Sequence, residues 1–275
     1  NINNTIIQDY TQYTAIKQRK VFRRFIRINV PEFGEWFLLN KDEEQGSNYL
    51  EGKKIVNMGD SITGASNFQS QLAKRLRANV INCGFGGTRM TYHTDPNYDK
   101  FSFVKLVDAK IANNFTEQDA AAANLTVTNM PANLANLKNT DFSTVDYLTI
   151  WFGTNDFSGD IYLGVNGSED TTTLKGALQY GIRRLQETYP QLKIIIITPM
   201  FRLYAPGNSD DTPNANRALY LKDYSKAEEE VAVLNHVPCL NMYDKSGINK
   251  FNHTHYLSDG LHPYLQNGYV HVGNK

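Results

Sequence analysis

Short apolar runs alternate with longer amphipathic stretches from residue 53 onwards. The runs have the length of strands and lie at 54–58, 79–82, 147–152, 192–198 and 238–242. The stretches between them carry apolar positions at helical spacing, at 66–77, 171–189 and 215–235. The run Ile194-Ile195-Ile196-Ile197 is continuously apolar, as in a strand covered on both faces. This pattern predicts an α/β fold with three α/β/α layers around a parallel five-stranded sheet.

Two regions depart from this alternation. Residues 88–143 form a long interval with helix-like stretches at 101–111 and 118–125 and a third that begins at Pro131. Residues 1–50 interleave basic and apolar positions and end in a polar, turn-rich segment. We therefore expect an N-terminal arm or small β-rich segment at 1–50 and a main domain at 51–275. The main domain would contain 88–143 as a helical insertion.

The basic stretch within 1–50 has two interpretations. It is consistent with a strand pair or short helix that packs by its apolar face, and with a basic arm for an anionic polymer. We favour the former, because the 28 Lys and Arg residues of the chain balance its 28 Asp and Glu residues. A net charge of zero gives no general attraction to nucleic acid. A role of 1–50 in homo-oligomerisation or in attachment to a larger chain stays open.

Hydropathy and cysteine content exclude few classes of protein. No apolar run approaches the roughly 20 residues of a transmembrane helix. The two cysteines, Cys83 and Cys239, follow apolar runs, so we expect buried free thiols rather than a disulfide framework.

Candidate chemistry begins directly behind the first strand of the main domain. Gly59-Asp60-Ser61-Ile62 places a serine on a tight turn at the end of an apolar run. Gly84–Gly87 and Asn155 also follow predicted strands. Because the carboxyl ends of parallel strands share one edge, where ligands bind in open α/β sheets, we expect these segments to converge.

A serine hydroxyl needs a base and an orienting group to act as a nucleophile. His262 is the candidate base, and Asp259 lies three residues earlier, close enough to bind its ring. A developing oxyanion also needs hydrogen-bond donors, for which Gly87, Asn155 and the Ser61 N–H are candidates. Each segment alone is a common turn. Their joint occurrence at strand ends predicts acyl transfer from an ester.

These residues resemble the SGNH hydrolases, also called the GDSL esterase family. The family is named for a serine, a glycine, an asparagine and a histidine, which match Ser61, Gly87, Asn155 and His262. The resemblance covers about 53–265 and implies a flavodoxin-like fold. It also implies Ser61 as nucleophile, an Asp259–His262 pair, and an oxyanion hole from the Ser61 and Gly87 backbones and the Asn155 amide. It implies no cofactor.

Two features depart from the family pattern. The interval between Gly87 and Asn155 is long, so we expect the insertion at 88–143 to shape the substrate cleft. Family members usually continue into a full closing helix after the histidine. Here residues 264–275 are few and contain Gly268 and Gly273, so we expect that cover to be missing or cut short.

Several neighbouring residues have open roles. Arg89 is either a contact for an anionic group of the substrate or a solvated or paired arginine. Tyr92, His93 and Tyr98 either line the cleft or only pack. The additional histidines at 253 and 255 suggest a metal site, but Asp259 and His262 are better explained by the triad, so we expect no metal.

The sequence therefore predicts a serine esterase that acts through an acyl-enzyme. Loops rich in Asn, Thr and Tyr favour a carbohydrate O-acetylesterase over a lipase or thioesterase. The resemblance extends to hydrolase modules of phage or Gram-positive cell-surface proteins, so an extracellular, cell-surface or virion-associated location is favoured. The alternative from another class is a glycan-binding or receptor-recognition module.

Overall fold

The computed structural model divides the chain into two compact units, Asn1–Glu51 and Gly52–Lys275. The residues it describes are 5–13, 19–27, 37–38, 50–65, 67–127, 129–205, 208–209, 212–265 and 267–273. Within them, no helix has both the length and the apolar character needed to cross a bilayer.

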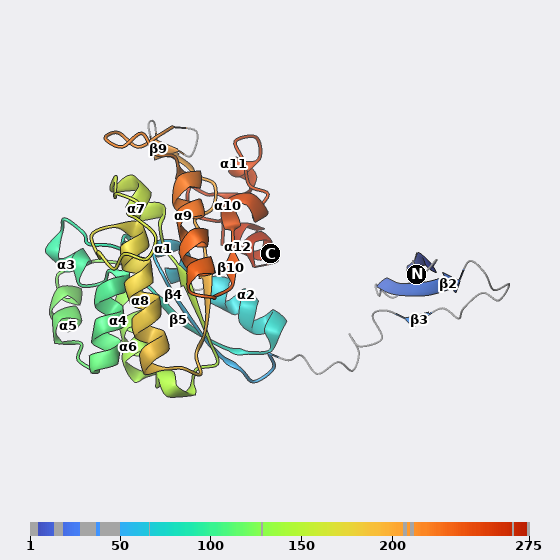
Figure 1. Cartoon of the computed structure of the whole chain (residues 1–275), viewed down its shortest axis with the longest axis horizontal. Coiled ribbons are helices and arrows are strands. Elements are labelled where there is room, and N and C mark those ends of the chain that lie inside the picture. The colour runs from blue at the N-terminus through green and yellow to red at the C-terminus, as the bar shows by residue number, and fades with distance from the viewer. Residues whose placement is uncertain are drawn as a thin grey trace. The chain divides into compact units, whose positions relative to one another are not determined.

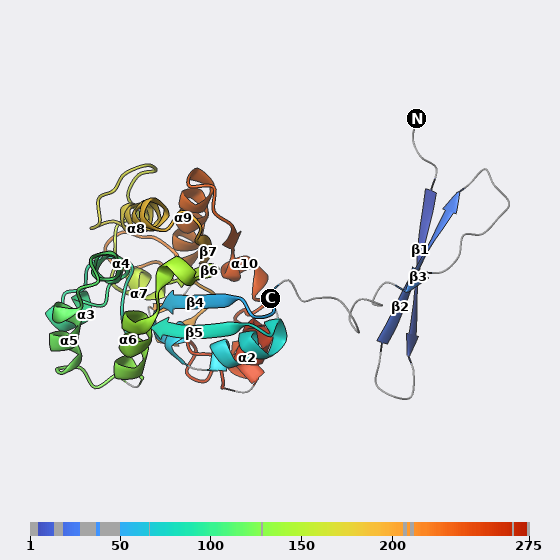
Figure 2. The same ribbon diagram turned by 90° about the horizontal axis from the view of Figure 1, so that it is seen from below.

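The N-terminal unit contains a three-stranded antiparallel sheet in the order β1-β2-β3. Its strands are β1 (Thr5–Tyr13), β2 (Arg19–Arg27) and β3 (Phe37–Leu38). The register of β1 and β2 pairs Thr5 with Arg27 and Tyr13 with Arg19, as a hairpin requires (Figure 2). The basic stretch at 19–27 is thus a strand in this unit.

The main unit is built on a parallel sheet in the order β10-β7-β6-β4-β5. The strands are β4 (Lys54–Gly59), β5 (Asn79–Gly84), β6 (Tyr147–Trp151), β7 (Lys193–Ile197) and β10 (Cys239–Leu240). Numbered within this sheet, the order is 2-1-3-4-5, which is the flavodoxin-like arrangement. The predicted five-stranded parallel sheet with helices on both sides is confirmed.

Two apolar cores cover the two faces of this sheet. On one face, α4 (Phe103–Ala112), α8 (Leu174–Thr188) and α9 (Leu221–Leu234) lie side by side (Figure 1). On the other face, α2 (Asn67–Leu76) packs with α12 (Asn267–Val272). Neighbouring residues of β6 alternate between the cores, since Ile150 belongs to the first and Trp151 to the second.

The segment between β5 and β6 is helical, as expected for 88–143. It contains α3 (Pro96–Asp99), α4, α5 (Thr116–Ala122), α6 (Met130–Asn139) and the short 3-10 helix η2 (Phe142–Thr144). The sequence pattern located α4, α5 and α6 to within three residues. It missed α3, a single turn that begins at Pro96 and is capped by Asp95.

Helix starts are the elements that the sequence located least well. We expected helices from 171 and from 215, but α8 begins at Leu174 and α9 at Leu221. Thr173 caps α8 by accepting a hydrogen bond from the Gly176 N–H. Ahead of α9, Ala218 has a positive φ of 55°, which breaks the helical backbone.

The remaining short elements surround the carboxyl ends of the strands. They are α1 (Ser61–Gly64), α7 (Thr154–Ser158), β8 (Leu203–Ala205), β9 (Asn208–Ser209), α10 (Met242–Lys245) and α11 (His253–Tyr256). Figure 2 shows the arrowheads of β4 and β5 pointing toward the side of the sheet where α7 lies. Both cysteines are free, with Cys83 buried and Cys239 half-buried.

Candidate active site

Ser61 is presented by an abrupt turn between β4 and α1. Asp60 is the N-cap of α1, and its carboxylate accepts a 2.9 Å hydrogen bond from the Ile62 N–H. The turn requires glycine at position 59, because an added Cβ would lie 2.1 Å from the Thr63 hydroxyl and 2.4 Å from the Trp151 carbonyl. Ser61 therefore stands at the first position of a helix, directly behind the carboxyl end of β4.

A hydrogen-bonded chain joins Ser61 to two residues near the C-terminus. Its hydroxyl lies 2.8 Å from Nε2 of His262, and Nδ1 of His262 lies 2.7 Å from Oδ2 of Asp259. The second carboxylate oxygen of Asp259 accepts the backbone N–H groups of Leu261 and His262. The structure thus brings together the serine, the histidine and the aspartate that the sequence suggested.

The charge state of Asp259 follows from these contacts. Partial burial alone would raise its pKa, but the hydrogen bonds from His262 and Leu261 outweigh burial and hold the pKa below its ordinary value. An ionised Asp259 at neutral pH keeps the Nδ1 proton on His262, so that Nε2 faces Ser61 as a proton acceptor.

The closing segment after His262 is present as a short helix, so of the two alternatives that we expected, missing or cut short, the first is wrong. Helix α12 has six residues, and its Tyr269 hydroxyl donates a 2.8 Å hydrogen bond to the Ile62 carbonyl. Gly268 allows this close packing, because an added Cβ would lie 2.2 Å from the Tyr256 carbonyl. The hydrogen bond from Tyr269 anchors this short helix to the turn that carries Ser61.

The predicted donors Gly87 and Asn155 lie on two adjoining loops. Gly87 is exposed and has a φ of 78°, and the ring of Tyr98 occupies the space that a Cβ would need. Asn155, in the first turn of α7, donates its side-chain amide to the Thr88 carbonyl at 2.8 Å. The loops after β5 and β6 are therefore linked directly beside the glycine.

Asp156 fixes the same junction from inside the protein. Its buried carboxylate accepts the Met90 N–H at 2.9 Å, the Thr91 N–H at 3.1 Å and the Thr91 hydroxyl at 2.8 Å. Burial raises the pKa of Asp156, while these hydrogen bonds and the charge of Arg89 oppose that shift. Sequence reasoning missed this role, because an aspartate after an asparagine looks like an ordinary turn residue.

The two candidate substrate contacts, Arg89 and Tyr92, lie in different surroundings. The guanidinium of Arg89 packs against the end of α7, where a Cβ on Gly159 would lie 2.3 Å from its Cζ atom. The charge of Arg89 also lowers the pKa of the buried Asp156, which supports the alternative of an arginine beside a carboxylate, and its contact with substrate stays a prediction. Tyr92 is 49% exposed, whereas Tyr98 packs on Gly87 and against the His93 ring at 5.1 Å. Tyr98 is therefore the tyrosine nearest to the predicted donor.

Two buried charged residues beneath Asn155 gave no signal in the sequence. Arg202 is 1% exposed, and its Nη1 donates to the carbonyl and hydroxyl oxygens of Thr154. Glu228 of α9 lies against Gly153, where an added Cβ would be 2.2 Å from its Oε1. Burial, with the charges of Asp156 and Asp60, raises the pKa of Glu228 well above its ordinary value. Glu228 belongs to a run of three glutamates and looks like a surface residue, and Arg202 lies in an apolar stretch that gives no indication of its partner.

The additional histidines do not form a metal centre in the described part of the chain. His253 is bonded through Nδ1 to the Lys250 carbonyl, and the His255 ring packs on Tyr256. No cluster of three or more potential ligands among His, Cys, Asp and Glu occurs in that part.

The fold and the site together define a class of protein, a flavodoxin-like α/β protein with serine, histidine and aspartate hydrogen-bonded at the carboxyl edge of a parallel sheet. The chain belongs to the GDSL-like lipase/acylhydrolase family, whose model matches residues 57–266. It is accordingly an ester hydrolase. A search of curated proteins gives no match.

Solved structures share the fold at low sequence identity. One crystal structure is 26% identical with a TM-score of 0.65, covering 82% of this chain and 94% of its own. A protein from Lactobacillus plantarum is 20% identical with a TM-score of 0.61, covering 82% and 95%. A possible lipase from Chitinophaga pinensis is 16% identical with a TM-score of 0.51, covering 80% and 95%.

Proposed function

We propose that this protein removes short acyl groups, above all acetyl, from a carbohydrate through an acyl-enzyme formed on Ser61. His262 takes the hydroxyl proton as Ser61 attacks the ester carbonyl, and Asp259 orients the ring and stabilises the imidazolium. His262 then gives that proton to the departing alcohol oxygen. Water repeats the sequence on the acyl-enzyme, so that a carboxylic acid leaves and Ser61 is regenerated.

Three donors would hold the negative oxygen of the tetrahedral intermediate. As the first residue of α1, Ser61 has an N–H that needs no intrahelical acceptor. The positive φ of Gly87 turns the loop after β5 at the carboxyl edge of the sheet, where Ser61 also lies. A carboxamide has two N–H donors, and the bond from Asn155 to Thr88 uses one and orients the other. These three groups are our proposed oxyanion hole.

The observation that supports a short acyl group is the wall formed by Val127. A methyl group placed on Gly86 would lie 2.9 Å from Cγ1 of Val127 and 3.7 Å from Cβ of Ser61. Val127 comes from the insertion between β5 and β6 and packs half-buried against the main core. With Tyr98 on the neighbouring Gly87, it narrows the space beside the nucleophile.

A panel of p-nitrophenyl esters and acetylated monosaccharides tests this proposal. We expect kcat/KM to fall from acetyl to octanoyl esters, and acetate release from the sugars to require Ser61. A preference for octanoyl esters would instead indicate a lipase or thioesterase. Glycan binding without turnover would indicate a recognition module.

The separate N-terminal unit suits attachment of the enzyme to a larger surface assembly, and we propose an extracellular role on that basis. The support is that Asn1–Glu51 forms a compact unit with its own antiparallel sheet. Light scattering of the full chain at several concentrations tests self-association through this unit. A mass equal to 31.2 kDa at every concentration excludes a homo-oligomer and leaves attachment to another chain.

A further inference from the structure

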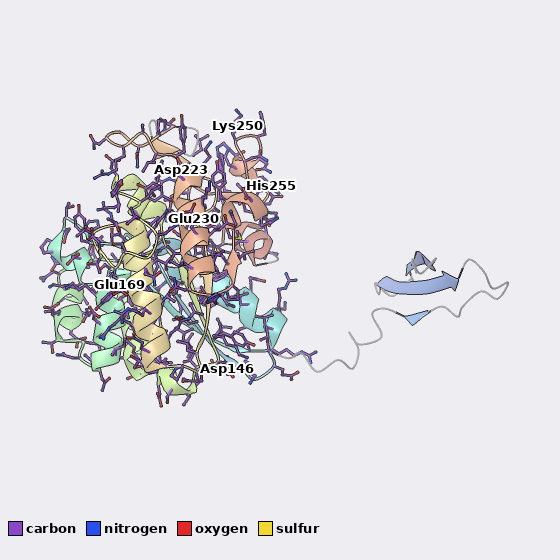
Figure 3. All side chains as sticks on the ribbon, viewed as in Figure 1. Asp146, Glu169, Asp223, Glu230, Lys250 and His255 are labelled. Atoms are coloured by element: carbon purple, nitrogen blue, oxygen red, sulfur yellow. The ribbon has the colours of Figure 1, made fainter. Side chains whose placement is uncertain are left out.

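A pocket of about 750 Å³ opens beside His262, on the side of the C-terminal helices. Its walls come from Ala65, at the end of α1, and from α11, the loop after it and the start of α12. The described residues that line it include Thr254, His255, Ser258, Tyr264, Leu265 and Asn267. Figure 3 shows His255 at the end of the sheet opposite to Asp146, which immediately precedes β6.

The chemistry of the proposed reaction decides which half of an ester would occupy this pocket. The proton taken from Ser61 is returned by Nε2 of His262 to the leaving oxygen, so the alcohol must lie on the His262 side. Val127 and Tyr98 lie next to Gly86 and Gly87, and neither lines the pocket beside His262. The pocket that includes His262 is therefore placed to receive the alcohol.

We infer that this pocket is the subsite for the alcohol portion of the substrate, and that its occupant is a neutral, polyhydroxylated ring. This inference rests on the proposed function, because it assigns the two halves of the ester from the roles of Ser61 and His262. It goes further by naming the residues that select the alcohol.

The lining has the chemistry that an uncharged sugar ring requires. Thr254 and Ser258 provide hydroxyl groups and Asn267 a carboxamide, which both donate and accept hydrogen bonds. Tyr264 is 42% exposed and Leu265 is 61% exposed, and together they offer an apolar surface for the C–H face of a ring. Among the described residues that line this pocket none is Asp, Glu, Lys or Arg, which favours a neutral ligand over a charged one. Its volume falls in the range of small-ligand sites.

The pocket is held in a fixed position relative to the nucleophile. The Tyr269 hydroxyl joins α12 to the Ile62 carbonyl, next to Ser61. The Tyr264 N–H bonds to the Tyr256 carbonyl at 2.8 Å, and the Tyr256 ring stacks on His271 at 4.2 Å. The wall that carries Tyr264 is therefore tied by hydrogen bonds and ring packing to the turn that carries Ser61.

The test varies the alcohol while the acyl group stays acetyl. The substrates are an acetylated methyl hexopyranoside, cyclohexyl acetate, ethyl acetate and p-nitrophenyl acetate. The variants are Tyr264→Ala and Asn267→Ala. The matched controls are Tyr162→Ala and Leu234→Ala, two exposed residues that do not line the pocket. Circular dichroism confirms that each variant is folded.

We expect Tyr264→Ala and Asn267→Ala to lower kcat/KM for the sugar ester relative to ethyl acetate by about tenfold each, through lost stacking and hydrogen bonding. Deacylation, measured after the p-nitrophenyl acetate burst, should not change, because the alcohol has already left. Both controls should leave the ratio unchanged. The inference is overturned if folded pocket variants keep the wild-type ratio of kcat/KM for the sugar ester to kcat/KM for ethyl acetate. It is also overturned if their deacylation rate falls by the same factor as that ratio.

The test also separates this inference from the proposed function. If the wild-type enzyme hydrolyses the simple esters but no sugar ester, the carbohydrate assignment fails. The polyhydroxylated occupant is then rejected. The pocket is still tested by the ratio of kcat/KM for cyclohexyl acetate to kcat/KM for ethyl acetate. If the pocket variants also leave that ratio unchanged, the alcohol subsite is rejected as well.

Discussion

The side-chain amide of Asn155 donates a 2.8 Å hydrogen bond to the backbone carbonyl of Thr88 and so joins the loops that follow β5 and β6. Gly87 precedes Thr88, so this bond fixes the distance between two of the three proposed oxyanion donors. The proposed oxyanion hole therefore depends on a contact between residues that are 67 positions apart.

Replacing Asn155 with alanine tests this arrangement. We expect kcat to fall by about 10²–10³-fold with little change in KM, because the donor acts on charge that develops in the transition state. Steady-state kinetics on p-nitrophenyl acetate measures both constants. The control is Asn133→Ala, which removes a similar amide bond to the Gly84 carbonyl at 2.7 Å. It should lower stability and leave kcat of the folded protein near wild type. Equal losses in both variants would argue against a catalytic role for Asn155.

Asp259→Asn tests the orientation of His262. An amide at this position offers only one acceptor oxygen, while Asp259 accepts the ring N–H with one oxygen and two backbone N–H groups with the other. We expect kcat to fall by about 10⁴-fold, as in serine hydrolases that lose this carboxylate. The measurement is kcat on a fast ester together with a thermal melt. A fully active, folded variant would show that Asp259 does not orient the base.

Val127→Ala tests the wall on the acyl side. Removing two methyl carbons beside Ser61 should raise the ratio of octanoyl to acetyl kcat/KM by roughly tenfold, since differences of this size in apolar contact set selectivity. Val231→Ala, in the buried face of α9, is the control for a general loss of packing. An unchanged chain-length ratio would mean that the acyl group lies elsewhere.

Glu228→Gln tests the buried carboxyl beneath the Gly153 turn. Because burial raises its pKa well above 4.5, the folded protein holds one more proton than the unfolded chain at pH values between the two pKa values. Wild-type stability therefore falls with rising pH in that window, by up to about 1.4 kcal/mol per pH unit from this residue. The glutamine variant should gain stability relative to wild type as pH rises.

Urea unfolding at pH 5 and pH 8 measures that difference. The neighbouring Glu229→Gln is the control and should show the wild-type pH dependence. Asp60, whose pKa burial raises to about 7, keeps a similar slope between about pH 4 and pH 7 in both variants. A constant stability difference between Glu228→Gln and wild type would indicate that Glu228 is ionised in the folded protein throughout.

The sequence alone predicted the parallel sheet and the candidate residues at its carboxyl edge, because both depend on local patterns. Apolar runs marked the five strands, and Ser61, Gly87 and Asn155 each follow one. The closing helix α12 was underestimated, because its stability comes from the tertiary bond between Tyr269 and Ile62. The start of α9 at Leu221 was missed because the left-handed backbone of Ala218 interrupts the helix before it.

The supporting charges could not be predicted from the sequence. Asp156 and Glu228 stand in polar local sequence and become buried where α7 and α9 pack together. Arg202 stands between Phe201 and Leu203, and nothing in that stretch indicates its partner Thr154. The pocket beside His262 is also a tertiary feature, built from three short segments without a shared motif.

The central claim is that Ser61, activated by His262, is the nucleophile. The most direct measurement treats the protein with a serine-directed phosphonate and locates the covalent adduct by peptide mass spectrometry. We predict a single adduct on Ser61 that forms at least 10-fold more slowly, as a rough bound, in His262→Ala. An adduct on another residue, or ester hydrolysis at the wild-type rate by Ser61→Ala, would contradict this account.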